Sequence, residues 1–163
     1  MTDETKAIRQ ASPAGAAALM GREIDQAEIL HRLRRPEGPV DVVLDTDTYN
    51  EIDDQFALAY LILSADRLRL KAIYAAPFHN EKSTGPADGM EKSYQEILRV
   101  LTLMKREDLR DIVLRGSTSY LKDERTPVDS PAARDLARRA MAYTPEKPLY
   151  VIAIGAITNV ASA

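Results

Sequence analysis

Five carboxylates lie within eleven residues of this chain, and no lysine or arginine lies among them. They are Asp45, Asp47, Glu51, Asp53 and Asp54, in the segment that ends at Gln55. Carboxylates at this density repel one another, so they must stay solvated, take up protons or gather around a cation. Oxygen ligands without a nearby cysteine or histidine suit a hard ion such as Ca²⁺ or Mg²⁺. The segment is therefore a candidate cation site.

The residues on either side of the acidic segment indicate a strand followed by a helix. Residues 40–44 form a β-branched run typical of a buried parallel strand, and residues 55–63 are typical of a helix. In open α/β sheets, ligands bind just beyond the carboxyl ends of the strands, so this position favours a cation. Asp53 and Asp54 fall in the first helical turn, where the helix dipole favours acids. That structural explanation covers two of the five carboxylates.

Strands and helices alternate along the rest of the chain. We predict further strands at residues 69–76, 111–114 and 149–154, and helices at residues 90–106 and 132–143. The alternation predicts a Rossmann-like α/β fold with an open, mainly parallel sheet flanked by helices. Polar groups follow each strand, namely the acidic segment, His79 with Asn80, residues 115–118 and the turn at Ile154. Because parallel strands end at the same edge, these groups should lie on one side of the sheet.

The chain divides into an extension and a domain. Residues 1–36 are expected to form an N-terminal extension with one helix, and residues 37–163 an α/β domain. The last strand is followed by about one helical turn, too short to cover a strand. We therefore interpret the domain as the first portion of a longer one, incomplete at its C-terminus. An uncovered sheet edge favours self-association, so we expect a homo-oligomer.

Composition restricts the partners of this 163-residue chain. Hydrophobic residues make up 45% and charged residues 29%, as in ordinary soluble proteins. The net charge of −3 provides no basic surface for nucleic acid or an anionic membrane. The chain has no cysteine, and no apolar run approaches the roughly 20 residues that span a bilayer. With no hydrophobic signal core at the amino end, we expect a cytoplasmic protein.

Two motifs of the domain resemble the inosine-uridine-preferring nucleoside hydrolases. That family has an apolar strand followed by DxDxxxDD, matched here by Asp45-Thr46-Asp47 and then Asp53-Asp54. Residues 153–159 are similar to its G-x-x-T-N turn, and the resemblance covers about residues 38–163. Between Asp47 and Asp53 this chain has five residues, two more than the family usually has.

The resemblance implies a calcium-dependent hydrolase. Asp47, Asp54 and the backbone carbonyl of Ile154 would bind Ca²⁺, and Asp45 would support that shell from behind. Asp47 would also accept a proton from a calcium-activated water. The cofactor implied is therefore Ca²⁺, and the catalytic residue implied is Asp47.

The substrate implied by the resemblance is a ribonucleoside. Asp53 and Asn80 would bind the ribose hydroxyls while the N-glycosidic bond is hydrolysed through an oxocarbenium-like sugar. The family's remaining metal-binding Asp and its leaving-group His belong to a later part of the fold. We therefore expect the 163-residue chain to bind metal weakly and to show little or no turnover.

Two other interpretations stay open at this point. Residues 42–48 also fit the hhhDxDx[TV] opening of haloacid-dehalogenase-like phosphatases, with Asp45 as nucleophile and Asp47 as acid/base. That pattern leaves Asp53 and Asp54 unexplained. The third interpretation is a non-catalytic domain that uses the acidic segment for Ca²⁺ alone.

Overall fold

A computed structural model describes residues 25–163 of the chain, which divide into two compact units at residues 37 and 38. Within the first unit, helix α3 spans Gln26–Arg32, and the Arg32 guanidinium pairs with Glu28 one turn earlier. One helix was expected within residues 1–36, of which residues 1–24 lie outside the described part of the chain. Since α3 ends at Arg32, the chain is no longer helical when it reaches Pro36.

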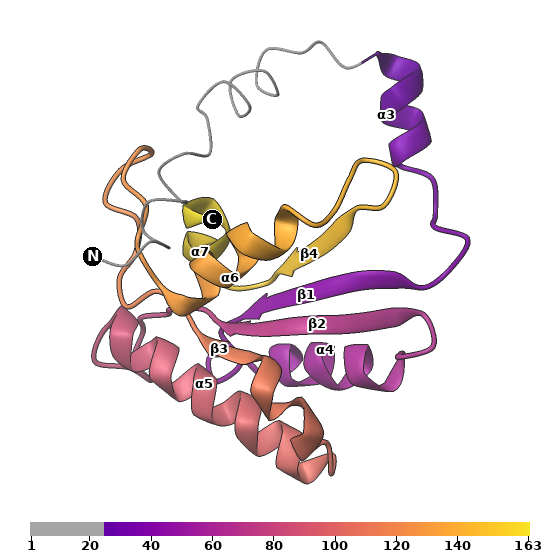
Figure 1. Cartoon of the computed structure of the whole chain (residues 1–163). Coiled ribbons are helices and arrows are strands. Elements are labelled where there is room, and N and C mark those ends of the chain that lie inside the picture. Colours follow the sequence, from indigo (N-terminus) through magenta and orange to yellow (C-terminus); the bar gives the residue numbers. More distant parts are fainter. Residues whose placement is uncertain (1–24) are drawn as a thin grey trace, which may run out of the picture. The chain divides into compact units, whose positions relative to one another are not determined.

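The second unit is built on a four-stranded parallel sheet (Figure 1). Its strands are β1 (Val40–Thr46), β2 (Leu68–Ala75), β3 (Val113–Arg115) and β4 (Leu149–Ala153). They lie in the order β3-β2-β1-β4, and every neighbouring pair is parallel. This confirms the predicted Rossmann-like α/β architecture. β1 is an inner strand, which explains why its apolar residues are buried on both faces.

Helices cover both faces of the sheet. They are α4 (Ile52–Leu63), α5 (Pro86–Leu103), α6 (Pro131–Ala140) and α7 (Thr158–Ser162), with a 3₁₀ helix η1 at Glu107–Ile112. In Figure 1, α4 and α5 lie on one side of the sheet, and α6 and α7 lie on the other. Among the described residues, no helix is long and apolar enough to cross a membrane.

Successive residues of β1 pack into two separate cores. Val42 and Leu44 contact the larger core, which includes residues of α4 and α5. Val43 contacts the smaller core, which includes Ala132 and Leu136 of α6. The alternation follows from the two-residue period of a strand, in which neighbouring side chains point to opposite faces.

Some predicted boundaries were wrong. α5 begins at Pro86 rather than at residue 90, because proline is well suited to the first turn of a helix. Residues 111 and 112 belong to η1, so β3 starts at Val113. Ile157 occupies the N-cap position of α7 and makes no side-chain cap. The amide of Asn159 is used within the site described next.

Candidate functional site

The carboxyl ends of the strands meet at one edge of the sheet, as the alternation of elements predicted. The backbone N–H of Ala76, just past β2, donates to the carbonyl of Thr46 at 2.8 Å. The backbone N–H of Ile154, just past β4, donates to the carbonyl of Asp45 at 2.9 Å. These bonds hold the loops after β2 and β4 against the end of β1, where the acidic segment begins.

Asp45 is fully buried at the end of β1. Its Oδ1 accepts a hydrogen bond from Asn159 Nδ2 at 2.8 Å, whereas its Oδ2 has no hydrogen-bond partner among residues 25–163. Burial raises the pKa of Asp45 to about 7; the Asn159 bond opposes the shift and the nearby charge of Asp47 adds to it. A buried carboxylate oxygen without a partner suits a proton or a cation.

Asn159 connects Asp45 to the end of β2 and to the loop after β3. Its Oδ1 accepts from the backbone N–H of Ser117 at 2.7 Å and from the Ser117 hydroxyl at 2.8 Å. Its Nδ2 also donates to the carbonyl of Ala75 at 3.3 Å, so the amide uses both donors and both acceptor positions. Gly116 makes this packing feasible, since a Cβ there would lie 2.1 Å from the Ala75 carbonyl oxygen. Asn159 is thus a site residue, which the sequence singled out only as the last residue of the G-x-x-T-N turn.

Asp54 lies buried in the first turn of α4 and faces the end of β1. The hydroxyl of Thr46 donates to Asp54 Oδ1. Because that hydroxyl has one proton, the 2.9 Å bond between Thr46 and Thr48 has Thr48 as the donor. Burial raises the pKa of Asp54 to about 6; the Thr46 bond opposes the rise, and the charges of Asp47 and nearby acids add to it.

Asp47 lies between the acidic loop and the turn that follows β4. It is 6% exposed, and its Oδ2 accepts a hydrogen bond from Asn50 Nδ2 at 3.0 Å. A Cβ placed on Gly155 would lie 2.9 Å from Asp47 Oδ1, so the missing side chain lets this turn approach the carboxylate. Burial raises the pKa of Asp47; the Asn50 bond opposes the shift and the charges of Glu51 and Asp53 reinforce it.

The two predicted sugar ligands lie at the outside of this group. Asp53 is exposed in the first turn of α4. Asn80 is half-buried after β2, where its Nδ2 donates to Asn50 Oδ1 at 2.6 Å and its Oδ1 accepts from the backbone N–H of Lys82 at 2.9 Å. The structure therefore links Asn80 to Asp47 through Asn50, a residue that the sequence did not single out.

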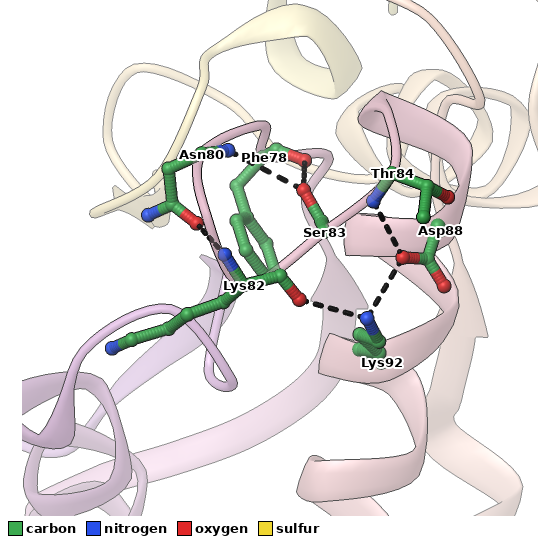
Figure 2. Close-up of polar contacts among 7 residues, drawn as sticks. All are labelled: Phe78, Asn80, Lys82, Ser83, Thr84, Asp88 and Lys92. Carbon is green, nitrogen blue, oxygen red and sulfur yellow. Dashed lines mark hydrogen bonds and ion pairs between the residues drawn. The ribbon is translucent and has the colours of Figure 1, made fainter.

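The loop that bears Asn80 is fixed to the start of α5 (Figure 2). The Ser83 hydroxyl donates to the carbonyl of Phe78 at 3.1 Å and accepts a 3.4 Å bond from the backbone N–H of Asn80. Lys92 Nζ, on α5, donates to the carbonyl of Lys82 at 2.7 Å. These bonds hold Asn80 in a defined place beside the acidic loop.

Asp45, Asp47 and Asp54 do not form a complete set of metal ligands. Among residues 25–163, no three histidine, cysteine, aspartate or glutamate side chains are arranged to bind an ion. The donors present nevertheless suit a hard cation. Asp45, Asp47 and Asp54 are buried, and no salt bridge within the described part of the chain reaches them. One oxygen of Asp45 also lacks a partner there.

The parallel sheet, with helices on both faces and an acidic turn after β1, defines a Rossmann-like α/β domain. Residues 41–163 match the family described as "Cellulose-binding Sde182, nucleoside hydrolase-like domain". This match covers more than half of the chain, so the protein belongs to that family. The predicted relation to nucleoside hydrolases holds at this broader level, and the match does not extend to the inosine-uridine-preferring family in particular. Comparisons with curated proteins and with solved structures gave no match.

Proposed function

We propose that the acidic turn binds Ca²⁺ and the sugar of a ribonucleoside, and that it supports hydrolysis of the N-glycosidic bond. One observation carries the proposal. Asp45, Asp47 and Asp54 are buried together at the end of β1, without a salt bridge in the described residues. When buried carboxylates with raised pKa values ionise, the folded protein loses stability, unless a cation compensates their charge.

The residues that would hold the cation are Asp47, Asp54 and the backbone carbonyl of Ile154. Asp45 would support them from behind, since its carboxylate is anchored by Asn159. Ca²⁺ would contribute stabilisation of negative charge and a lower pKa for a coordinated water molecule. Oxygen donors of this kind match its preference for carboxylates and carbonyls.

The protein's own groups would carry the remaining chemistry. Asp47, whose Oδ2 is anchored by Asn50, would accept a proton from the attacking water. Asp53 and Asn80 would bind the ribose hydroxyls, and the anionic oxygens around the ring would stabilise an oxocarbenium-like sugar as the bond to the base breaks. This arrangement needs no covalent intermediate.

Calorimetric titration of Ca²⁺ tests the proposal. We expect binding heat for the wild-type protein and a loss of affinity of at least about tenfold in Asp54→Asn, which removes a charged ligand. Asp66→Asn is the matched control, because Asp66 is an exposed carboxylate in the turn after α4. Any release of free ribose from nucleosides should require both Ca²⁺ and Asp47. Absence of binding heat in the wild type, or a normal affinity in Asp54→Asn, would contradict the proposal.

The phosphatase interpretation fits the structure less well. A nucleophilic aspartate must present a carboxylate oxygen to its substrate. Asp45 is fully buried, and its Oδ1 is bonded to Asn159. Phosphate release that is lost in Asp45→Asn but retained in Asp54→Asn would restore this interpretation.

A second candidate function is carbohydrate binding without hydrolysis. The family's description contains the words "cellulose-binding", which favours a polysaccharide ligand for this domain. Co-sedimentation with insoluble cellulose, with and without Ca²⁺, separates the two candidates. Cellulose binding by a protein that releases no ribose would favour the second function.

A further inference from the structure

Asn50 lies in the loop between β1 and α4, in the stretch that is two residues longer than the DxDxxxDD motif. Its polar groups contact two different loops. The backbone N–H donates to the Asp47 carbonyl at 2.6 Å, and Nδ2 donates to Asp47 Oδ2 at 3.0 Å. Its Oδ1 accepts from Asn80 Nδ2 at 2.6 Å, and its carbonyl accepts from Lys82 Nζ. No other residue described here bonds to both Asp47 and Asn80.

The contact with Asp47 anchors one oxygen of that carboxylate. Asn50 occupies Oδ2, and Oδ1 is the atom closest to the position that a Gly155 side chain would fill. Asn50 thereby fixes the rotation of the carboxylate about its Cβ–Cγ bond. A terminal torsion of this kind is otherwise broad, so one hydrogen bond has a large effect on it.

The contact with Asn80 leaves both amides able to bind a ligand. Each side-chain nitrogen has two N–H groups and each oxygen two acceptor positions. Asn50 gives one N–H to Asp47, Asn80 gives one N–H to Asn50, and each amide oxygen accepts one bond. Each amide therefore retains one donor and one acceptor, which suits neighbouring hydroxyl groups of a sugar.

Lys82 completes the connection from the other loop. Its Nζ donates to the Asn50 carbonyl, while its backbone N–H donates to Asn80 Oδ1. Its own carbonyl accepts from Lys92 Nζ, as Figure 2 shows. The loops after β1 and β2 are thus joined by two hydrogen bonds, and the second loop is attached to α5.

We propose that Asn50 is a positioning residue that joins Asp47 and Asn80 into one hydrogen-bonded unit. In this unit Asn50 holds the Asp47 carboxylate, which would bind the cation, at a fixed separation from the Asn80 amide, which would bind the sugar. The inference rests on the proposed function, because it assigns Asn50 a role in binding a ribose-bearing ligand. It also assigns a function to the two additional residues of the loop between β1 and α4.

The test measures the affinity for inosine in the presence of Ca²⁺ by calorimetry. We expect Asn50→Ala to weaken binding about tenfold, and to have an effect of less than about threefold when Asn80→Ala is already present. Such non-additivity indicates that Asn50 acts through Asn80. Gln95→Ala is the control, because Gln95 is exposed on α5 and bonds only to Glu91 in the described structure.

Two further measurements separate positioning from a general loss of structure. The side-chain amide resonances of Asn80 should move in the ¹H–¹⁵N spectrum of Asn50→Ala, while resonances of the sheet stay in place. Lys82→Met removes the bond to the Asn50 carbonyl and leaves the Asn50 side chain intact. It should weaken inosine binding in the same direction, by a smaller factor.

The outcomes distinguish this inference from the proposed function. An inosine affinity in Asn50→Ala equal to that of the wild type, additive losses in the double variant, or an unmoved Asn80 resonance would overturn the role of Asn50 alone. A wild-type protein that binds neither Ca²⁺ nor inosine would overturn the proposed function, and this inference with it.

Discussion

Single residues at the edge of the sheet determine how its carboxylates are held. Asn159 is fully buried and satisfies Asp45, Ser117 and Ala75 at the same time. A leucine has the same number of side-chain heavy atoms but could form none of these bonds. Polar groups left unpaired in the interior cost about 1–3 kcal/mol each. The cost of replacing Asn159 should therefore exceed that of an ordinary surface substitution.

We expect Asn159→Ala to lower the free energy of unfolding by about 3 kcal/mol, because it leaves the Ser117 N–H and one oxygen of Asp45 without partners. Urea unfolding followed by circular dichroism measures the change. Thr102→Ala is the control, since Thr102 is exposed on α5, and it should stay within about 0.5 kcal/mol. A change below about 1 kcal/mol in Asn159→Ala would show that water replaces the amide.

At the residue scale, the sequence predicted those site residues that lie close to one another along the chain. Asp45, Asp47 and Asp54 could be recognised because the motif contains all three within ten residues. The role of Asn159 could not be recognised, because Asp45 lies 114 residues away from it. Asn50 was equally hidden, since its bond to Asn80 crosses 30 residues. Partners that come together only through tertiary structure leave no local pattern.

At the scale of elements, α6 is attached to the sheet by a hydrogen bond from Tyr74 of β2 to the buried carboxylate of Asp135. Asp135 on α6 accepts from the Tyr74 hydroxyl of β2 at 2.8 Å and from Arg138 at 2.6 Å, and it also pairs with Arg139. Burial by itself would raise the pKa of Asp135. The hydrogen bonds from Arg139, Tyr74 and Arg138 outweigh burial and hold the pKa below its usual range.

This depressed pKa makes part of the stability dependent on pH. The contribution of Asp135 is fully present above the pKa of an unfolded aspartate, and it is lost as the pH falls through the lower folded value. We expect the wild type to lose more unfolding free energy than Asp135→Asn between about pH 7 and about pH 3. Urea unfolding at both pH values measures this difference. Equal losses in the two proteins would show that Asp135 is not the group responsible.

The sequence predicted the types and order of these elements better than their ends. The sequence predicts a strand at residues 111–114, although the first two of these residues belong to the 3₁₀ helix η1. A short apolar run has the same composition in either structure, and only the pairing of β3 with β2 at Val113 determines where the strand begins.

At the scale of the whole molecule, β4 pairs with β1 on one side and with no other described strand on the other. Its apolar side chains are partly exposed, with Tyr150 at 36% and Val151 at 37%, and Ile154 beyond it at 42%. The sequence showed that the run was apolar, which is typical of a strand buried on both faces. It could not show that β4 is an edge strand among the described strands, with its apolar side chains partly exposed.

An open strand edge with apolar side chains can pair with the same edge of a second copy. We therefore expect the protein to associate as its concentration rises, and Val151→Lys to weaken that association. A lysine on an edge strand opposes such pairing because two copies would bring like charges together. Sedimentation velocity over a range of concentrations measures the effect, with Leu103→Lys as the control for an apolar residue exposed at 68% on α5. If the wild type sediments as a monomer throughout, or if both variants behave alike, then β4 is not the surface through which copies of this protein meet.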